Sequence, residues 1–228
     1  MYISPRMELS DFAFNHYSQF GEDGIIEKIF EVLPKRDAYH CVEFGAQVVM
    51  TSENCLTGTD RLAEANEALN LDLIINVQGD EPIIDPAEIL KVVNFALDNP
   101  GSIVNAVALI DDEIEFESVT IPKVVMTPER KLLYMSRSKI PGSKNQDFKF
   151  GYKQICIYAF PKEVLQLFRS HPEKTRLEAI EDIEILRFLE LGLDVEMVEV
   201  SGKSMAVDVP SDVVKVRKII KNIEKIVS

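Results

Sequence analysis

The stretch Asp72-Leu73-Ile74-Ile75-Asn76-Val77 is a short apolar run rich in β-branched residues, and the polar segment Gln78-Gly79-Asp80-Glu81-Pro82 follows it directly. Such a run predicts a buried strand that ends in a polar loop. A helix is expected next, because Asp85 can act as its N-cap, Pro86 suits the first helical position and Glu88 stands three residues after the cap. A strand, a loop and a helix in this order indicate an α/β domain.

Strand-like and helix-like segments alternate along most of the remaining chain, which is typical of an α/β domain with a mixed, mostly parallel sheet. Further strands are expected at residues 102–110, 123–127, 131–136, 154–160 and 195–200. Helices are expected at residues 25–33, 162–169 and 177–191, and a last one opens at Pro210. The irregular polar stretch 142–150 is expected to serve as a lid or a dimer loop.

The bulk properties favour a single globular domain of the cytoplasm. The 228 residues are 46% hydrophobic and 28% charged, so the chain can bury one substantial core. The formal net charge of −13 argues against a nucleic-acid partner, which would require basic side chains. No apolar run approaches the ~20 residues that span a bilayer, and the start lacks the apolar core of a signal peptide. The widely spaced Cys41, Cys55 and Cys156 suit reduced thiols.

Two acidic loops are candidates for a magnesium site. Asp80 follows the first predicted strand, and Asp208 lies in the loop 206–212, between a late strand and the last helix. Ligands of open α/β sheets bind at such strand ends, and paired carboxylates there could hold Mg²⁺. The alternative for each aspartate alone is ordinary turn and helix-cap chemistry.

Two further segments are candidates for substrate contacts. The hydroxyl-rich loop 50–61 runs into a helix at Thr59 or Asp60, where amides and hydroxyls could meet a base or a phosphate; the alternative is a plain N-cap. Arg137 could hold a substrate carboxylate in bidentate fashion, or it could be a solvated surface charge.

These segments, taken in order, closely resemble CMP-Kdo synthetases, the 3-deoxy-manno-octulosonate cytidylyltransferases. The resemblance begins at about residue 45 and runs to the end of the chain. It is carried by residues 44–52, 57–64, 76–82, 136–141, 157–159, 177–187 and 207–212.

The resemblance implies a three-layer α/β domain of the nucleotide-diphospho-sugar-transferase type. It also implies that CMP passes from CTP to the anomeric hydroxyl of a 3-deoxy-2-ulosonic acid, with release of pyrophosphate, for lipopolysaccharide or surface-polysaccharide synthesis. A homodimer without nucleic-acid or membrane partners is expected.

The resemblance also assigns roles to individual residues. Asp80 and Asp208 match the magnesium ligands of the family, and with Arg137 they are the predicted catalytic residues. The predicted sugar-binding residues are Gln78, Gln154, Tyr158 and Glu184. The nucleotide is expected to contact Thr57, Gly58, Thr59 and Asp60, with Arg61 nearby.

The chain departs from the family pattern in two places. Gln154 stands where the family usually has His, and Ile185 stands where it has Gln, so a related sugar is possible. The family also begins with a strand and a Gly-rich basic loop that holds the triphosphate, and no such loop is found before Gly45.

Residues 1–44 are therefore expected to form a foreign segment packed on a cytidylyltransferase-like domain of residues 45–228. Residues 17–26 and 41–46 resemble the opening of a family of SAM-dependent sugar methyltransferases. The alternative is a helix and a strand that replace missing core. Two other functions stay open: a non-catalytic dimeric or partner-binding module, and a methyltransferase, which the incomplete cofactor site disfavours.

Overall fold

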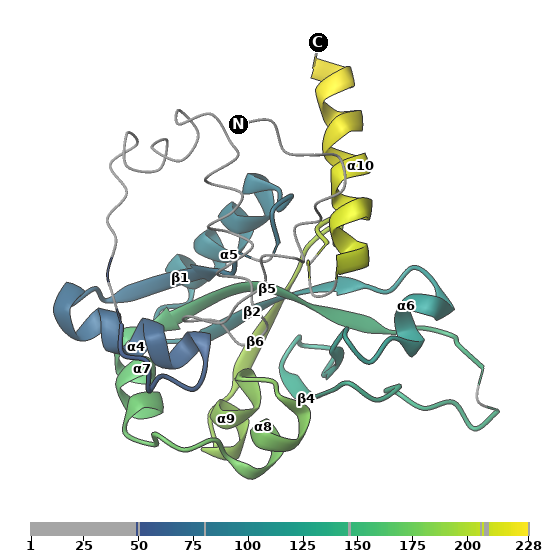
Figure 1. Cartoon of the computed structure of the whole chain (residues 1–228). Coiled ribbons are helices and arrows are strands. Elements are labelled where there is room, and N and C mark those ends of the chain that lie inside the picture. Colours follow the sequence, from purple (N-terminus) through teal and green to yellow (C-terminus); the bar gives the residue numbers. More distant parts are fainter. Residues whose placement is uncertain are drawn as a thin grey trace. The chain divides into compact units, whose positions relative to one another are not determined.

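The computed structural model describes residues 49, 51–79, 81–145, 147–205, 207 and 210–227 (Figure 1). Residues 54–205 form one compact unit, and helix α10 (Pro210–Val227) belongs to a second one. The predictions for residues 1–44, including the helix at 25–33, lie outside the described residues. In the described part, no helix is long and apolar enough to cross a membrane.

The predicted strand and helix are found on either side of the loop. The prediction of a buried strand is wrong, because this strand pairs with only one other described strand: Leu73, Ile74 and Ile75 are half-buried and Val77 is 36% exposed. Strand β1 (Leu73–Val77) is followed by helix α5 (Pro86–Asp98). The carboxylate of Asp85 accepts a hydrogen bond from the amide of Ala87 (2.8 Å), which confirms the predicted N-cap.

Apart from the helix at 177–191, the other elements predicted within the described residues are also found, with boundaries close to those expected. The strands are β2 (Ile103–Leu109), β3 (Lys123–Met126), β4 (Leu132–Ser136), β5 (Tyr152–Pro161) and β6 (Val195–Glu199). In the described part of the chain, the helices besides α5 and α10 are α4 (Gly58–Leu69), α6 (Glu113–Glu117), α7 (Lys162–Arg169), α8 (Arg176–Glu181) and α9 (Ile185–Glu190). Only the short α6, which Asp112 caps, was not predicted.

Strand β5 organises the sheet. Along the order β4-β3-β5-β2-β6, β5 pairs with β2 on one edge, and its other edge is shared by β3 and β1. The sheet is mixed, as predicted. The predicted majority of parallel pairs is not found among the described strands, where only β2 and β6 pair in parallel. The reason is that β5 runs against all three of its neighbours.

Two apolar clusters make the predicted three layers. Helix α5 covers one face of the sheet through Val92 and Ala96, which pack on Ile155 and Ile157 of β5. Helices α4, α7 and α9 lie over the opposite face (Figure 1). There, Phe160 of β5 stacks on Tyr158, with ring centroids 5.6 Å apart.

The predicted single helix at 177–191 is wrong, because α8 and α9 are separate. Asp182 breaks the helix by adopting a left-handed conformation with φ of 53°. Its carbonyl accepts a hydrogen bond from Arg137 (3.0 Å), and its carboxylate pairs with Lys174 (2.6 Å). These long-range contacts stabilise a backbone conformation that residues other than Gly, Asn and Asp rarely adopt. The predicted end at Gly192 is confirmed, with φ of 81°.

Candidate functional site

Several predicted site residues lie together beside the end of β1. The amide Nε2 of Gln78 and the carboxylate of Glu184 both lie close to Gly58, since a Cβ atom at this glycine would meet them at 3.5 and 3.4 Å. The buried hydroxyl of Tyr158 belongs to the same region, because Cys156, Glu184 and Glu81 all act on its pKa. Burial is the largest cause and raises this pKa well above its ordinary value.

The carboxylate of Glu184 binds to the N-terminus of helix α4. Its carboxylate accepts hydrogen bonds from the amide of Gly58 (3.0 Å), the amide of Thr59 (2.8 Å) and the hydroxyl of Thr59. Helix N-termini attract negative charge because their first amides lack partners within the helix. The amides that the sequence offered to a nucleotide are therefore bound to a carboxylate of the chain itself.

The neighbouring Thr57 is the N-cap of α4. Its hydroxyl accepts a hydrogen bond from the amide of Asp60 (3.2 Å) and donates one to the Asp60 carboxylate (2.8 Å). The plain N-cap, left open from the sequence, is thus present, and contact of residues 57–60 with a nucleotide stays a prediction.

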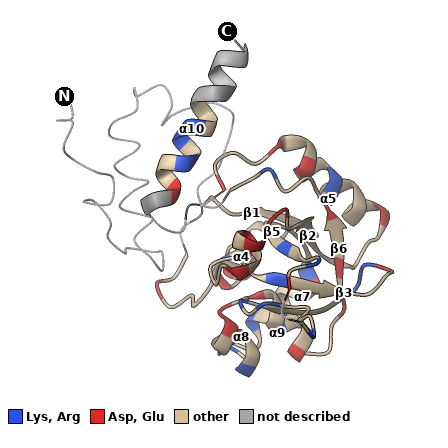
Figure 2. Cartoon of the chain, turned by 90° about the vertical axis from the view of Figure 1, so that its right-hand side faces the viewer, with Lys and Arg blue, Asp and Glu red and all other residues tan. Residues whose placement is uncertain are grey.

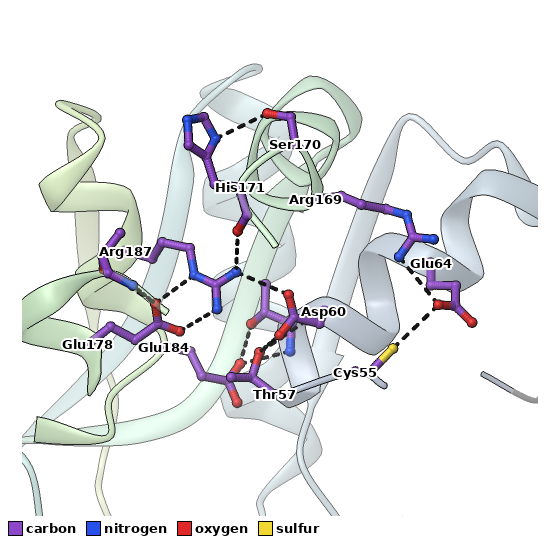
Figure 3. A network of polar contacts seen from close by, with 12 residues as sticks. Cys55, Thr57, Asp60, Glu64, Arg169, Ser170, His171, Glu178, Glu184 and Arg187 are labelled. Carbon is purple, nitrogen blue, oxygen red and sulfur yellow. Dashed lines mark hydrogen bonds and ion pairs between the residues drawn. The ribbon is translucent and has the colours of Figure 1, made fainter. Parts of the chain in front are cut away.

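A fully buried arginine, Arg187, holds this region together (Figure 3). Its guanidinium donates two hydrogen bonds to Glu178, both 2.6 Å, and others to Asp60 (3.1 Å) and to the carbonyl of His171 (3.0 Å). It also stacks on Phe168, 3.7 Å from the ring centroid. Sequence reasoning gave Arg187 no role, although a charge inside the apolar helix segment Ile185-Leu186-Arg187-Phe188 is a recognisable sign of a buried ion pair.

On the other side of the site, Glu81 replaces a missing strand partner of β5. Between the residues of β5 that pair with β3 and those that pair with β1, the amide of Cys156 donates to Glu81 (2.7 Å). The carbonyl of Cys156 accepts from the amide of Gln78 (3.2 Å). Ser204 donates to the second oxygen of Glu81, so this buried carboxylate connects β5 with the chain after β6. Sequence reasoning missed Glu81 as well.

Arg137, at the end of β4, contacts backbone carbonyls. Its guanidinium donates to Glu181 (2.6 Å), Asp182 (3.0 Å), Val119 (3.2 Å) and Thr120 (3.3 Å). Most of its donors are thereby occupied, since a guanidinium has five. Its predicted bidentate contact with a substrate carboxylate stays a prediction.

Lys123 adds a second cation beside Arg137. Its ammonium is buried and donates to the carbonyls of Ser118 (2.6 Å), Ile121 (2.8 Å) and Arg137 (2.7 Å). Burial, assisted by the charge of Arg137, lowers the pKa of Lys123 to about 8. The loop before β3 is therefore tied to the end of β4 through a lysine.

The two predicted magnesium ligands, Asp80 and Asp208, lie outside the described residues. Among the residues that the structure describes, no cluster of three or more His, Cys, Asp or Glu side chains is placed to bind a metal ion. Acidic residues mark α4, α5 and α8, with basic residues interspersed (Figure 2).

Fold and site together define a class, the three-layer α/β nucleotidyltransferases. A family model described as cytidylyltransferase matches residues 35–198. The 3-deoxy-manno-octulosonate cytidylyltransferase of Desulfatibacillum aliphaticivorans is 37% identical over 79% of this chain and 75% of its own length. The enzyme of the same name from Geobacter sulfurreducens is 37% identical over 78% of this chain and 76% of its own length.

Solved structures agree with these relatives. A CMP:2-keto-3-deoxy-manno-octonic acid synthetase complexed with CTP superposes with a TM-score of 0.72 at 30% identity, covering 83% of this chain and 78% of that one. The inositol-1-phosphate CTP transferase from T. maritima, with a TM-score of 0.53 at 16% identity over 80% of this chain and 69% of that one, shares the fold. This chain belongs to the 3-deoxy-manno-octulosonate cytidylyltransferase family, so the predicted family and fold class are confirmed.

Replacing the buried arginine tests the ion network. Arg187→Met should lower the free energy of unfolding by about 3–5 kcal/mol, because Glu178 and Asp60 would keep buried charges without a cation. Urea denaturation measures the loss. The matched control is Arg176→Met, at an exposed position on α8, which should change the stability by no more than about 0.5 kcal/mol. Equal losses in the two variants would contradict the network.

The pH dependence of stability tests the partly buried carboxyl of Glu184. Burial raises its pKa from 4.5, and the hydrogen bonds from Thr59 and Gly58 oppose this shift. A raised pKa in the fold means that stabilisation is fullest below the unfolded pKa and is lost as the pH rises through the folded pKa. The free energy of unfolding of the parent, minus that of Glu184→Gln, should therefore decrease from pH 4 to neutrality.

The control for this series is Glu173→Gln, which removes a carboxylate from an exposed position. A difference between the parent and Glu184→Gln that stays constant or increases with pH would show that the fold does not destabilise the anion of Glu184.

Proposed function

We propose that this chain transfers CMP from CTP to a 3-deoxy-2-ulosonic acid, 3-deoxy-manno-octulosonate or a close relative, and releases pyrophosphate. One observation carries the proposal: Gln78, Tyr158 and Glu184, far apart in sequence, lie around the N-terminus of α4 in a chain of this family. The alternative of a non-catalytic module is not favoured, since relatives with this activity in their names match over most of the chain.

In this reaction, the bonds form and break between the two substrates. The anomeric hydroxyl of the sugar attacks the α-phosphorus of CTP, the new O–P bond forms, the bond to pyrophosphate breaks and the hydroxyl proton is released. Gln78, Gln154 and Tyr158 would orient the sugar, and Arg137 would face its negative charge. Positioning of this kind contributes to phosphoryl and nucleotidyl transfer by making the attack effectively intramolecular.

We also propose that Mg²⁺ binds to Asp80 and Asp208, because carboxylate oxygens are its preferred protein ligands. The described carboxylate next in sequence, Glu81, fits another role, since both of its oxygens accept hydrogen bonds from Cys156 and Ser204. When bound, the ion would neutralise the charge of the phosphates.

Pyrophosphate release tests the activity. The purified chain with Mg²⁺, CTP and 3-deoxy-manno-octulosonate should release pyrophosphate, and Asp80→Asn and Asp208→Asn should each lower kcat by about 100-fold or more. A panel of related 3-deoxy-ulosonic acids identifies the preferred sugar.

The control for these substitutions is Asp98→Asn, at the exposed end of α5, which should turn over like the parent. A folded parent that is inactive with every sugar would favour the non-catalytic alternative. Full activity of both Asp80→Asn and Asp208→Asn would refute the metal assignment.

We further propose a cytoplasmic homodimer that serves lipopolysaccharide or surface-polysaccharide synthesis. Exposed apolar side chains support a second copy as partner: Val119, Leu133 on the sheet-edge strand β4, and Ile180 on α8 are 68%, 57% and 70% exposed. An edge strand can pair with a strand of another chain, because its outer backbone groups lack partners in the sheet.

Sedimentation velocity tests the dimer. The parent should sediment as a species of twice the chain mass. The double variant Leu133→Lys, Ile180→Lys should sediment as a monomer, because the new charges would be buried in the interface. Leu97→Lys, on the exposed side of α5, is the control and should stay dimeric. A monomeric parent at micromolar concentration would refute the proposal.

A further inference from the structure

The ladder between β2 and β5 is interrupted beside the candidate site. Asn105 lies opposite Tyr158, but the next residue of β2, Ala106, lies opposite Ile155. Cys156 and Ile157 therefore have no opposite residue on β2, as in a bulge. Backbone groups of β5 that face this gap require other hydrogen-bond partners, because buried polar groups are costly to leave unpaired.

The side chain of Asn105 fills the gap. It is fully buried, and its amide nitrogen donates to the carbonyl of Ile155 (2.9 Å) and to the carbonyl of Ile157 (3.1 Å). Its amide oxygen accepts a hydrogen bond from Nε2 of Gln154 (2.9 Å). Both hydrogens and the oxygen of the Asn105 amide are thus engaged.

This arrangement determines which way both amides point. Carbonyl oxygens only accept, so the group of Asn105 that faces Ile155 and Ile157 must be its NH₂. The group that faces Gln154 is then the oxygen, which also only accepts. Gln154 must therefore turn its own NH₂ toward Asn105, and the reversed orientation would place two acceptors against each other.

Gln154 is left with one acceptor and one donor for a ligand. Its oxygen Oε1 and the second hydrogen of Nε2 are not used by Asn105, and its side chain is half-buried. The amide lies near Tyr158, because Asn105, to which it is bound, stands opposite Tyr158 in the sheet. Tyr158 is another of the predicted sugar-binding residues.

We propose that Asn105 is a positioning residue for the sugar, and that Gln154, held by Asn105, recognises one hydroxyl group of the sugar and not its carboxylate. A hydroxyl both donates and accepts, so it matches the edge that Gln154 presents. A carboxylate only accepts hydrogen bonds, so one of its oxygens would lie against Oε1, which also only accepts. This inference rests on the proposed cytidylyltransferase function and adds the chemical group that this subsite selects.

Single-deoxy analogues of the sugar test the proposal. The parent should have a kcat/KM about 10- to 100-fold lower for one analogue, the one without the recognised hydroxyl, since a lost hydrogen bond in a polar site costs about 1–3 kcal/mol. Gln154→Met should abolish this discrimination and leave selectivity at the other hydroxyls unchanged. Asn105→Ala should have the same effect, mainly through KM, because it frees the Gln154 amide to rotate.

The matched control is Gln166→Met, on the exposed side of α7, which should keep the discrimination of the parent. Unchanged discrimination by Gln154→Met at every hydroxyl would overturn the inference. If the parent released no pyrophosphate, the proposed function would fail, and the amide geometry would be tested separately.

That separate test uses NMR of the parent with ¹⁵N-labelled glutamine and asparagine, and it requires no activity. The side-chain NH₂ of Gln154, assigned through Gln154→Met, should exchange with solvent at least about 10-fold more slowly than that of Gln166, since a hydrogen bond to a buried acceptor protects it. This NMR test of the parent also replaces the kinetic test of Asn105→Ala if that variant fails to fold. Equal exchange rates would show that Asn105 does not hold Gln154.

Discussion

The candidate site depends on an interruption in the middle of strand β5. Three strands pair with β5, yet around Cys156 neither edge carries a regular ladder. Side chains take over on both edges, the carboxylate of Glu81 on one and the amide of Asn105 on the other. Because the backbone groups are satisfied by Glu81 and Asn105, the gap is compatible with a stable core.

The opposite side of the site is built on buried charge. Arg187 connects α9 with Glu178 of α8 and Asp60 of α4, and Glu184 binds the first amides of α4. Helix α4 is thereby fixed to α8 and α9, which come much later in the chain (Figure 3). The same contacts limit what a nucleotide can bind there, because its phosphates would have to displace a carboxylate that the fold already holds. Base and sugar contacts suit this helix end better than phosphate contacts.

Several groups that resemble substrate ligands in the sequence are already paired within the protein. Arg137 donates to backbone carbonyls, and Glu184 accepts from α4. Such pairing fixes the side chains before a substrate arrives, which reduces the entropy lost on binding. Their orientation then determines which substrate groups can be accepted, as the amide of Gln154 illustrates.

The sequence by itself determined the strand at 72–77, the cap at Asp85 and the family, because these depend on local periodicity, capping chemistry and motif order. Only the tertiary structure decided the roles of Glu81, Asn105 and Arg187, whose partners stand 75, 50 and 127 residues away. It also decided the break of the helix at Asp182, where contacts from Arg137 and Lys174 outweigh local helix propensity. Local patterns report which backbone conformations are favourable, whereas pairing across the fold determines which polar groups are already bound and which remain available to a ligand.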